Sequence, residues 1–374
     1  MRLRRWWGIV AGCACCLVVA PIARLEAAPE QASVPQVALV GCQHIHTPSF
    51  IRILRRRGNE VKVKYVWDHD RKLAEQDSKQ LAGSQVVDDV QTIFADPEIK
   101  AVIICSETDR HQPLVMAAAK AHKDIYAEKP LGMGAADGYA MAKAIDDAGV
   151  LFETGYFMRG DPKVLFLKEQ VEKGNFGTIT RVRGSNTHNG ALGGWFDHEY
   201  QWMADPKQAG VGAYGDLGTH SLDILIWLMG DVSRATATVS MGTHRYPDCD
   251  EFGEGLLVFK NGTLGTLAAG WDDVAADPVS LEICGTEGHA VIMDGRLYFM
   301  SKRVKGSSDR RPWTDLPKAW PEPMEMFIDA INGKKQPLVT ADEAAYRSAV
   351  AEALYKAARE QSWATPVTGE SGAK

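Results

Sequence analysis

The chain has 374 residues and a formal net charge of -6, and hydrophobic residues make up 45% of it. This length suits two domains, and the apolar fraction is sufficient for a large core. The negative charge argues against nucleic acid as a partner, because proteins that bind nucleic acid present basic surfaces to the phosphates.

Residues 1–28 have the composition of an export signal. Three arginines among the first five residues precede an uncharged apolar stretch from Trp6 to Ala23, and the small residues Ala27 and Ala28 follow. This order predicts a cleaved signal peptide, so we expect an exported periplasmic or extracellular protein without stable membrane insertion after signal removal.

Two features of this leader leave alternatives open. Arg4-Arg5-Trp6-Trp7 resembles a twin-arginine signal, the export route for folded proteins. Val10-Ala11-Gly12-Cys13 resembles a lipoprotein processing box, although the apolar run continues well past Cys13. An uncleaved anchor is a third option.

From residue 36 to residue 155 the pattern alternates strand and helix. Short apolar β-branched runs predict the strands, and a helix start at Thr47-Pro48 and a stop at Gly58 bound the first helix. We predict strands at 37–40, 61–67, 85–88, 101–105, 125–127 and 150–154, with helices at 47–58, up to about 81, at 112–122 and at 135–148. Such alternation indicates a doubly wound parallel sheet, so we expect residues 36–155 to form a Rossmann domain.

Residues 156–365 have a different pattern, which predicts an α+β substrate-binding domain with a large, mostly antiparallel, open sheet. Asn261-Gly262 is a strong hairpin signal between two of its strands. We predict strands at 178–185, 234–241, 255–259, 263–269, 279–285 and 290–293, and helices at 162–172, 219–229, 324–331 and 341–359. Residues 366–374 are expected to form a flexible tail.

The loop after the first strand contains part of a dinucleotide-binding motif. Gly41 occupies the first position of a GxGxxG pattern, but Gln43 and His46 stand at the second and third glycine positions. Gln43 and His44 are candidates to donate a hydrogen bond to the pyrophosphate, and Ile45 belongs to the same predicted cofactor-binding loop. A Rossmann-like domain with a lapsed cofactor site is the alternative.

The carboxyl ends of the other strands supply more candidate cofactor contacts, because ligands of doubly wound sheets bind there. Asp68 follows the second strand, where an acidic residue contacts the adenosine ribose and favours NAD over NADP; Arg71 nearby leaves NADP possible. Ser106 and Glu128 end later strands, and we add His111 to this set.

Lys129 lies between Glu128 and Pro130, directly after a predicted strand. Pro130 has no N–H and stops the strand, which presents Lys129 at the edge of the sheet. The alternative is an ordinary surface ion pair between Lys129 and Glu128.

Asp216 and His220 are four residues apart at the start of the predicted helix 219–229. They share a helix face with Asp223, opposite an apolar side, so three polar groups lie on one stripe. A histidine with its ordinary pKa suits proton transfer near neutrality. The alternatives are that Asp216 is only the N-cap and that His220 is a core histidine.

Candidate substrate contacts precede this helix. His188, Trp195 and His198 belong to a Gly-rich segment with further aromatic residues, which suits either stacking on a sugar ring or packing of a long loop. Arg159 is a further candidate. The four cysteines after the leader have no CxxC pair, so we predict no metal site, and Cys42 and Cys105 are expected to be buried thiols.

Together these residues and the order of elements resemble the Gfo/Idh/MocA oxidoreductase family, from about Val37 to about Val367. The resemblance implies an NAD(P)-dependent dehydrogenase acting on CH–OH groups of a sugar or polyol. It implies that Lys129 contacts the nicotinamide ribose and a substrate hydroxyl, that His220 is the general base, and that Asp216 positions the substrate and the imidazole. We also expect a homo-oligomer formed through the C-terminal sheet.

Two rival functions stay open. The first is an NAD-dependent glycosidase on the same fold, in which transient oxidation of the sugar assists elimination. The second is a non-catalytic ligand-binding or regulatory protein, which the incomplete glycine motif favours.

Overall fold

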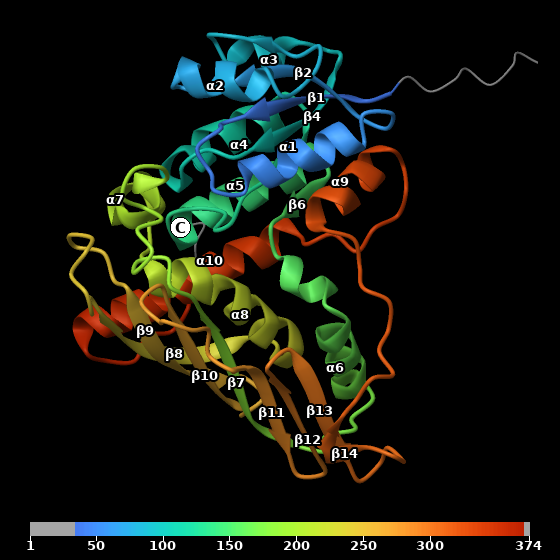
Figure 1. Ribbon diagram of the computed structural model, residues 1–374, viewed down its shortest axis with the longest axis vertical. Helices are drawn as coiled ribbons and strands as arrows, with labels where there is room; N and C mark the ends of the chain where they lie inside the picture. Colours follow the sequence, from blue (N-terminus) through green and yellow to red (C-terminus); the bar gives the residue numbers. More distant parts are fainter. Residues whose placement is uncertain (1–33, 370–374) are drawn as a thin grey trace, which may run out of the picture. The chain divides into compact units, whose positions relative to one another are not determined.

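The computed structural model describes residues 34–369, and the predicted signal segment 1–28 lies outside them. Two sheets organise this part of the chain (Figure 1). Among its helices, none combines the length and the apolar character that a bilayer span requires.

Sheet A has six parallel strands in the order β3-β2-β1-β4-β5-β6. The strands are β1 Gln36–Val40, β2 Lys62–Trp67, β3 Gln85–Val86, β4 Ile99–Ile104, β5 Asp124–Ala127 and β6 Phe152–Thr154. The intervening helices are α1 Thr47–Arg56, α2 Arg71–Ser78, α3 Gln91–Ala95, η1 Thr108–Arg110 (a 3₁₀ helix), α4 His111–Lys120 and α5 Ala135–Ala148. The chain reverses its direction across the sheet between β1 and β4, which is the switch point where such sheets bind ligands.

Helices cover both faces of sheet A, as its apolar strands require. Apolar side chains of α1, α2 and α9 pack on one face, and those of α3, α4, α5 and the start of α10 pack on the other. The doubly wound Rossmann sheet predicted from the sequence is therefore confirmed.

Sheet B has eight strands in the order β14-β13-β12-β11-β7-β10-β9-β8, and only the β7–β10 pair is parallel. The strands are β7 Ile179–Thr187, β8 Val232–Ser240, β9 Phe252–Phe259, β10 Leu264–Gly270, β11 Val279–Gly285, β12 Gly288–Met293, β13 Arg296–Ser301 and β14 Ser308–Pro312. This confirms the predicted large, mostly antiparallel sheet. The Asp294-Gly295 turn, with φ of 49° and 70°, was an overlooked sequence signal for β13.

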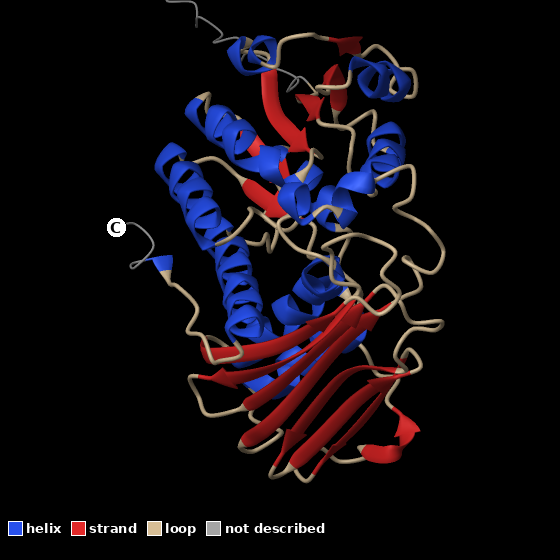
Figure 2. Ribbon diagram, turned by 90° about the vertical axis from the view of Figure 1, so that its left-hand side faces the viewer, coloured by secondary structure: helices blue, strands red, loops and turns tan. Residues whose placement is uncertain are grey.

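Helices pack on one face of sheet B (Figure 2). The remaining helices are η2 Phe157–Gly160, α6 Pro162–Glu172, η3 Gln201–Ala204, α7 Pro206–Ala209, α8 Ala213–Met229, α9 Pro323–Ile331 and α10 Ala341–Glu360. Helix α8 contacts β7, β9 and β10, and every one of its residues except Trp227 is buried. Its polar side chains are therefore held inside the protein.

Helix α10 connects the two halves of the fold, because it packs against α5 beside sheet A and against β8 of sheet B. Residues from Val34 onward form one compact unit, and the domain boundary at residue 155 stays a prediction. The start of the predicted flexible tail contacts the protein, since Val367 O accepts a hydrogen bond from Tyr139 Oη at 3.1 Å. Residues 370–374 lie outside the described part.

Candidate active site

The loop between β1 and α1 packs closely on the end of β4. Gly41 has φ of +89°, and a Cβ built on it would lie 2.4 Å from Ser106 N. Glycine is therefore required there both by conformation and by close approach. The backbone N–H groups of Gln43 and His44 donate to Cys105 O at 3.1 and 3.0 Å, so these amides face β4. Helix α1 begins at Thr47, and His46 is its N-cap.

Asp68 lies beside this loop at the end of β2, as predicted. Its carboxylate accepts hydrogen bonds from Cys42 N at 2.6 Å and from Gln43 Nε2 at 3.2 Å, and only 5% of the residue is exposed. Through these hydrogen bonds Asp68 holds the β1–α1 loop against the end of β2, where Rossmann domains bind the adenosine ribose. Its contact with a cofactor stays a prediction.

His111 is the first residue of α4, and its ring lies against the loops that follow β4 and β5. The residue is fully buried, its Nδ1 lies 3.2 Å from Pro130 O, and its Nε2 lies 3.3 Å from Ser106 O. Burial lowers the pKa of this imidazole, which keeps it neutral. Both ring nitrogens face backbone carbonyls, so His111 joins the loops after β4 and β5. Its contact with a cofactor stays a prediction.

Lys129 is buried, and its ammonium group contacts Asp216. The Lys129 Nζ atom donates to Asp216 Oδ1 at 2.7 Å, and Lys129 is 3% exposed. The alternative of a surface ion pair with Glu128 is therefore wrong. This contact joins the carboxyl edge of sheet A to the first turn of α8.

Helix α8 begins at Ala213, six residues earlier than predicted, because Gly212 rather than Asp216 is the N-cap. Asp216 therefore lies inside the first turn, and His220 lies one turn later. His220 is 4% exposed, its ring packs 4.9 Å from that of Phe157, and its Nδ1 is buried without a hydrogen-bond partner. An unpaired buried nitrogen is costly in a purely structural histidine, which favours a functional role.

The charges of these groups differ from those of free side chains. Burial would raise the pKa of Asp216, but the ammonium group of Lys129 lowers it overall, so the carboxylate is charged. Burial lowers the pKa of His220 well below its ordinary value, and Lys129 adds to this effect. His220 is thus a neutral imidazole next to a buried ion pair, and its pKa is lower than the ordinary value expected from the sequence.

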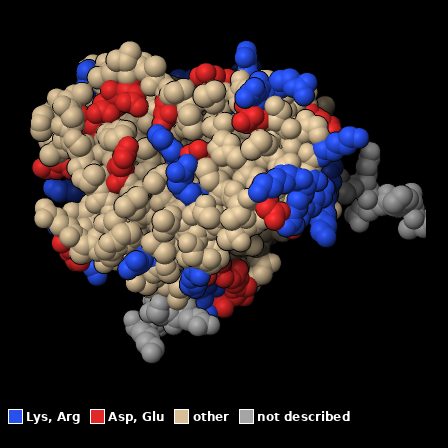
Figure 3. All heavy atoms as spheres, turned by 90° about the horizontal axis from the view of Figure 1, so that it is seen from below, with Lys and Arg blue, Asp and Glu red and all other residues tan. Residues whose placement is uncertain are grey.

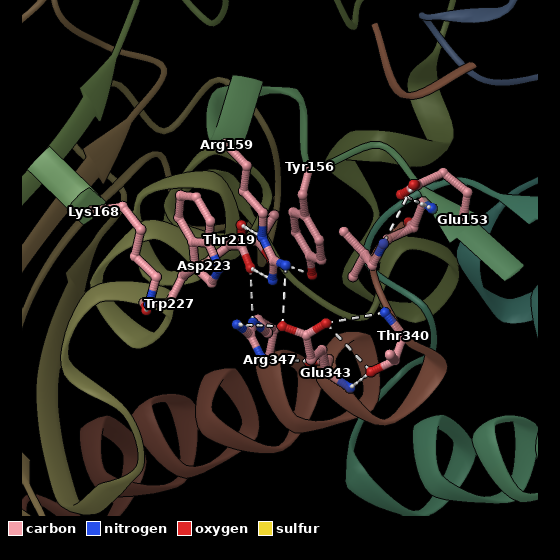
Figure 4. Close-up of polar contacts among 12 residues, drawn as sticks. Glu153, Tyr156, Arg159, Lys168, Thr219, Asp223, Trp227, Thr340, Glu343 and Arg347 are labelled. Carbon is pink, nitrogen blue, oxygen red and sulfur yellow. Dashed lines mark hydrogen bonds and ion pairs between the residues drawn. The ribbon is translucent and has the colours of Figure 1, made fainter. Parts of the chain in front are cut away.

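Arg159 and Asp223 belong to a separate buried network (Figure 4). The Arg159 guanidinium donates to both Asp223 oxygens, at 2.8 and 2.6 Å, and to Glu343 Oε1 at 3.0 Å. Arg347 Nε donates to the same Asp223 at 2.8 Å. The Arg159 guanidinium thus joins η2, α8 and α10, and its contact with a substrate stays a prediction.

The predicted substrate contacts His188, Trp195 and His198 lie in the segment between β7 and η3. His188 stacks on Trp195 with ring centroids 4.7 Å apart, and Trp195 is 45% exposed. His198 lines a cavity of about 470 Å³ together with Gln43 and the end of β2. Trp202, which was not among the predicted site residues, donates from Nε1 to Gln43 O at 2.9 Å. Contacts of these side chains with a substrate stay predictions.

Glu128 and two histidines of the loop form a contiguous polar group. Glu128 is fully buried, His46 Nδ1 lies 3.2 Å from its Oε1, and His44 Nε2 lies 3.8 Å from its Oε2. His46 was not among the predicted site residues. The sequence signal was its place at the third glycine position of the motif, which indicated only a departure from the pattern.

The cysteines behave as expected, since Cys42 and Cys105 are buried free thiols.

A cavity of about 450 Å³ lies between η2, α6 and sheet B, beyond Phe157. Neither Lys129 nor Asp216 lines it. Both of them line a smaller cavity, of about 10 Å³.

Two family models match the chain. One, described as an oxidoreductase family with an NAD-binding Rossmann fold, matches residues 36–156, and the other, the GFO/IDH/MocA C-terminal domain, matches residues 164–291. Together they match more than half of the chain. The protein belongs to the Gfo/Idh/MocA family. The order of the two models agrees with the order of sheets A and B.

Several characterised relatives of this Gfo/Idh/MocA chain share about a quarter of its residues. Levoglucosan dehydrogenase of Pseudarthrobacter phenanthrenivorans is 27% identical over 61% of this chain and 64% of its own length, so the match spans less than two thirds of that relative. The scyllo-inositol 2-dehydrogenase (NAD(+)) of Bacillus subtilis is 27% identical over 75% of this chain and 81% of its own. The 1,5-anhydro-D-fructose reductase of Ensifer adhaerens is 24% identical over 86% and 95%.

Solved structures show the same fold. Levoglucosan dehydrogenase in complex with NADH and levoglucosan superposes with a TM-score of 0.74 at 22% identity, over 88% of this chain and 99% of that one. WlbA dehydrogenase from Bordetella pertussis in complex with NADH and UDP-GlcNAcA gives a TM-score of 0.73 at 20% identity, over 89% and 98%. At this identity the likeness establishes the fold of this family member.

Proposed function

We propose that this protein is an NAD(P)-dependent dehydrogenase that acts on a CH–OH group of a sugar or polyol. The observation that carries the proposal is the buried Lys129–Asp216 ion pair with the neutral His220 one helical turn further along α8. An acceptor for a proton and a fixed positive charge are the two groups that oxidation of an alcohol requires from the protein. The dehydrogenases and the reductase among its relatives support this reaction class.

The residues present fit a nicotinamide dinucleotide at the switch point of sheet A. Gly41 allows the close approach of the loop, and Asp68 stands at the end of β2 where a ribose is contacted. Ser106 ends β4 on the same edge. When bound, the cofactor accepts the carbon-bound hydrogen of the substrate as hydride.

In the proposed mechanism His220 takes the hydroxyl proton of the substrate on its unprotonated imidazole. The ammonium group of Lys129 stabilises the alkoxide oxygen as negative charge develops. Asp216 holds this ammonium group in place through the 2.7 Å contact, so its proposed role is to orient Lys129 as well as the substrate. Because the three side chains are buried, their charges act with little screening by water.

Binding of the cofactor tests this proposal directly. We expect isothermal titration to show that NAD binds more tightly than NADP, because the Asp68 carboxylate accepts hydroxyls and repels a 2′-phosphate. Asp68→Ala should weaken NAD binding and reduce the preference. Asp70→Ala is a matched control, since this neighbouring acid caps α2 through Lys72 N. Absence of any nucleotide binding by the wild-type protein would contradict the proposed activity.

A non-catalytic ligand-binding protein is the second candidate, and one observation favours it. The backbone N–H groups of Gln43 and His44 donate to Cys105 O, and Trp202 Nε1 donates to Gln43 O. These two amides therefore already have partners inside the protein, whereas a cofactor-binding loop offers its amides to the pyrophosphate. A protein of this kind would bind sugars without reducing NAD. Screening sugars and polyols by NADH absorbance separates the two candidates, because only the dehydrogenase produces NADH.

We also propose that the protein is exported, by the twin-arginine route, after which residues 1–28 are removed. The order of charged, apolar and small residues in the sequence supports this. N-terminal sequencing of protein from the extracytoplasmic fraction should find a chain that starts near Ala28. A mature chain starting at Met1 would indicate an anchor, and lipid on Cys13 would indicate a lipoprotein.

Association through sheet B is a further part of the proposal. Leu256 of β9 and Leu264 of β10 are 49% and 56% exposed on neighbouring strands, on the side of the sheet away from α8. The surface seen from below sheet B is largely uncharged (Figure 3). Leu264→Glu should therefore shift the protein toward monomers in analytical ultracentrifugation, whereas a wild-type monomer would contradict this proposal.

A further inference from the structure

Three side chains capable of binding a metal converge between the β1–α1 loop and the end of β5. One nitrogen of His44, one nitrogen of His46 and a carboxylate oxygen of Glu128 all lie within 4.8 Å of one another. The sequence predicted no metal site, because its cysteines lack the required spacing. These three ligands include no cysteine, and His46 and Glu128 come together from positions 82 residues apart in the chain.

Among residues 34–369, the ion-pair partners of the buried Glu128 carboxylate are the two histidines, and no lysine or arginine side chain pairs with it. Its neighbour Lys129 directs its ammonium group to Asp216 instead. The remaining contacts of the carboxylate are with the rings of His44 and His46 and with the backbone N–H of Lys129, which donates to Glu128 Oε2 at 3.1 Å. A fully buried carboxylate needs a cationic partner, and a metal ion held by neutral imidazoles supplies one.

We propose that His44, His46 and Glu128 bind a divalent transition-metal ion, of which Zn²⁺ is the simplest example. Imidazole nitrogens and one carboxylate oxygen are ligands that suit zinc, iron and nickel. Three protein ligands leave at least one coordination position open, as in catalytic sites.

Metal binding requires one local change at His44. In the structure, the His46 N–H donates to His44 Nδ1 at 3.2 Å, which leaves the proton of a neutral ring on Nε2, facing Glu128. Binding of a metal through Nε2 would require the other tautomer, with the ring proton on Nδ1, and the long hydrogen bond from the His46 N–H would be lost.

The test measures Co²⁺ and Zn²⁺ binding by the full chain prepared without a polyhistidine tag. We expect one metal ion per chain by elemental analysis after dialysis, and visible Co²⁺ absorption without a thiolate charge-transfer band. Glu128→Gln and His46→Gln should each weaken binding by more than about 10-fold. His46 is half-buried, so its substitution guards against a loss of folding at Glu128, and circular dichroism verifies the fold of both variants.

Two control variants make the result specific. His122→Asn changes an exposed histidine at the end of α4 and should leave metal binding unchanged. Cys284→Ser tests the other cluster of metal-binding side chains in residues 34–369, Glu282, Cys284 and His289, where Arg181 Nη2 lies 3.2 Å from the sulfur and opposes a cation.

The proposal is overturned if the wild type retains no metal, or if the Glu128 and His46 variants bind it as tightly as the wild type. Binding lost only in the cysteine variant, with a thiolate band in the wild type, would also overturn it. These measurements use neither NAD nor substrate. Failure of the metal site is thus distinguishable from failure of the proposed dehydrogenase activity.

Discussion

His220→Ala should lower kcat by roughly 10²–10⁴ and leave NAD affinity nearly unchanged, because loss of a general base removes proton transfer from the rate-limiting chemistry. The measurement is steady-state NADH production on the native substrate, once a screen of sugars and polyols has identified it. Activity of the variant should partly return at high pH, where the substrate hydroxyl ionises without help.

The wild-type pH profile gives an independent check on the same residue. A base works only while it is unprotonated, and the pKa of His220 lies well below 6.5 because of burial and the charge of Lys129. The rate should therefore hold as the pH falls through 6.5 and decline only at clearly lower pH.

His122→Ala is the matched control for His220→Ala, since that histidine is exposed on the end of α4. Full turnover by His220→Ala would refute the assigned role. A large drop in its melting temperature, with no specific loss of kcat in the protein that remains folded, would instead identify His220 as a core histidine.

Asp223→Ala should destabilise the protein by about 3–5 kcal/mol, the usual cost of removing one partner from a buried ion pair. The carboxylate is 1% exposed and accepts hydrogen bonds from Arg159 and Arg347, which are also buried. Its loss leaves two guanidinium groups inside the protein, and Glu343 is the ion-pair partner that remains for both among residues 34–369. The midpoint of chemical denaturation should fall accordingly.

Asp231→Ala is the control for charge removal, because Asp231 forms an exposed ion pair with Lys260 at 2.8 Å. Exposed pairs contribute about 0–1 kcal/mol, so this variant should unfold close to the wild-type midpoint. Equal midpoints for the Asp223 and Asp231 variants would show that the buried network does not stabilise the fold.

Local patterns in the sequence were sufficient for the fold class. Short β-branched runs such as 101–105, followed by helices with recognisable starts and stops, predicted the parallel sheet, and Asn261-Gly262 predicted the hairpin between β9 and β10. These signals act over a few residues and need no tertiary information. The same reasoning placed Gly41, Asp68 and Lys129 at strand ends, where the structure has them.

The start of α8 was predicted wrongly because the aspartate near it is an ambiguous signal. Asp216 suited an N-cap, but Gly212 takes that place and the helix begins earlier. An aspartate near a helix start favours the first turn as well as the cap, so the pattern alone does not choose between them.

Side-chain partners were decided only by the tertiary structure. Lys129 and Asp216 are 87 residues apart, and Arg159 meets Glu343 across 184 residues. From the sequence alone, Glu128 was a candidate partner for the charge of Lys129, and a substrate was the predicted partner for the charge of Arg159. Which partner it receives depends on how α8 and α10 pack between the two sheets, and helical or strand periodicity contains no information about that packing.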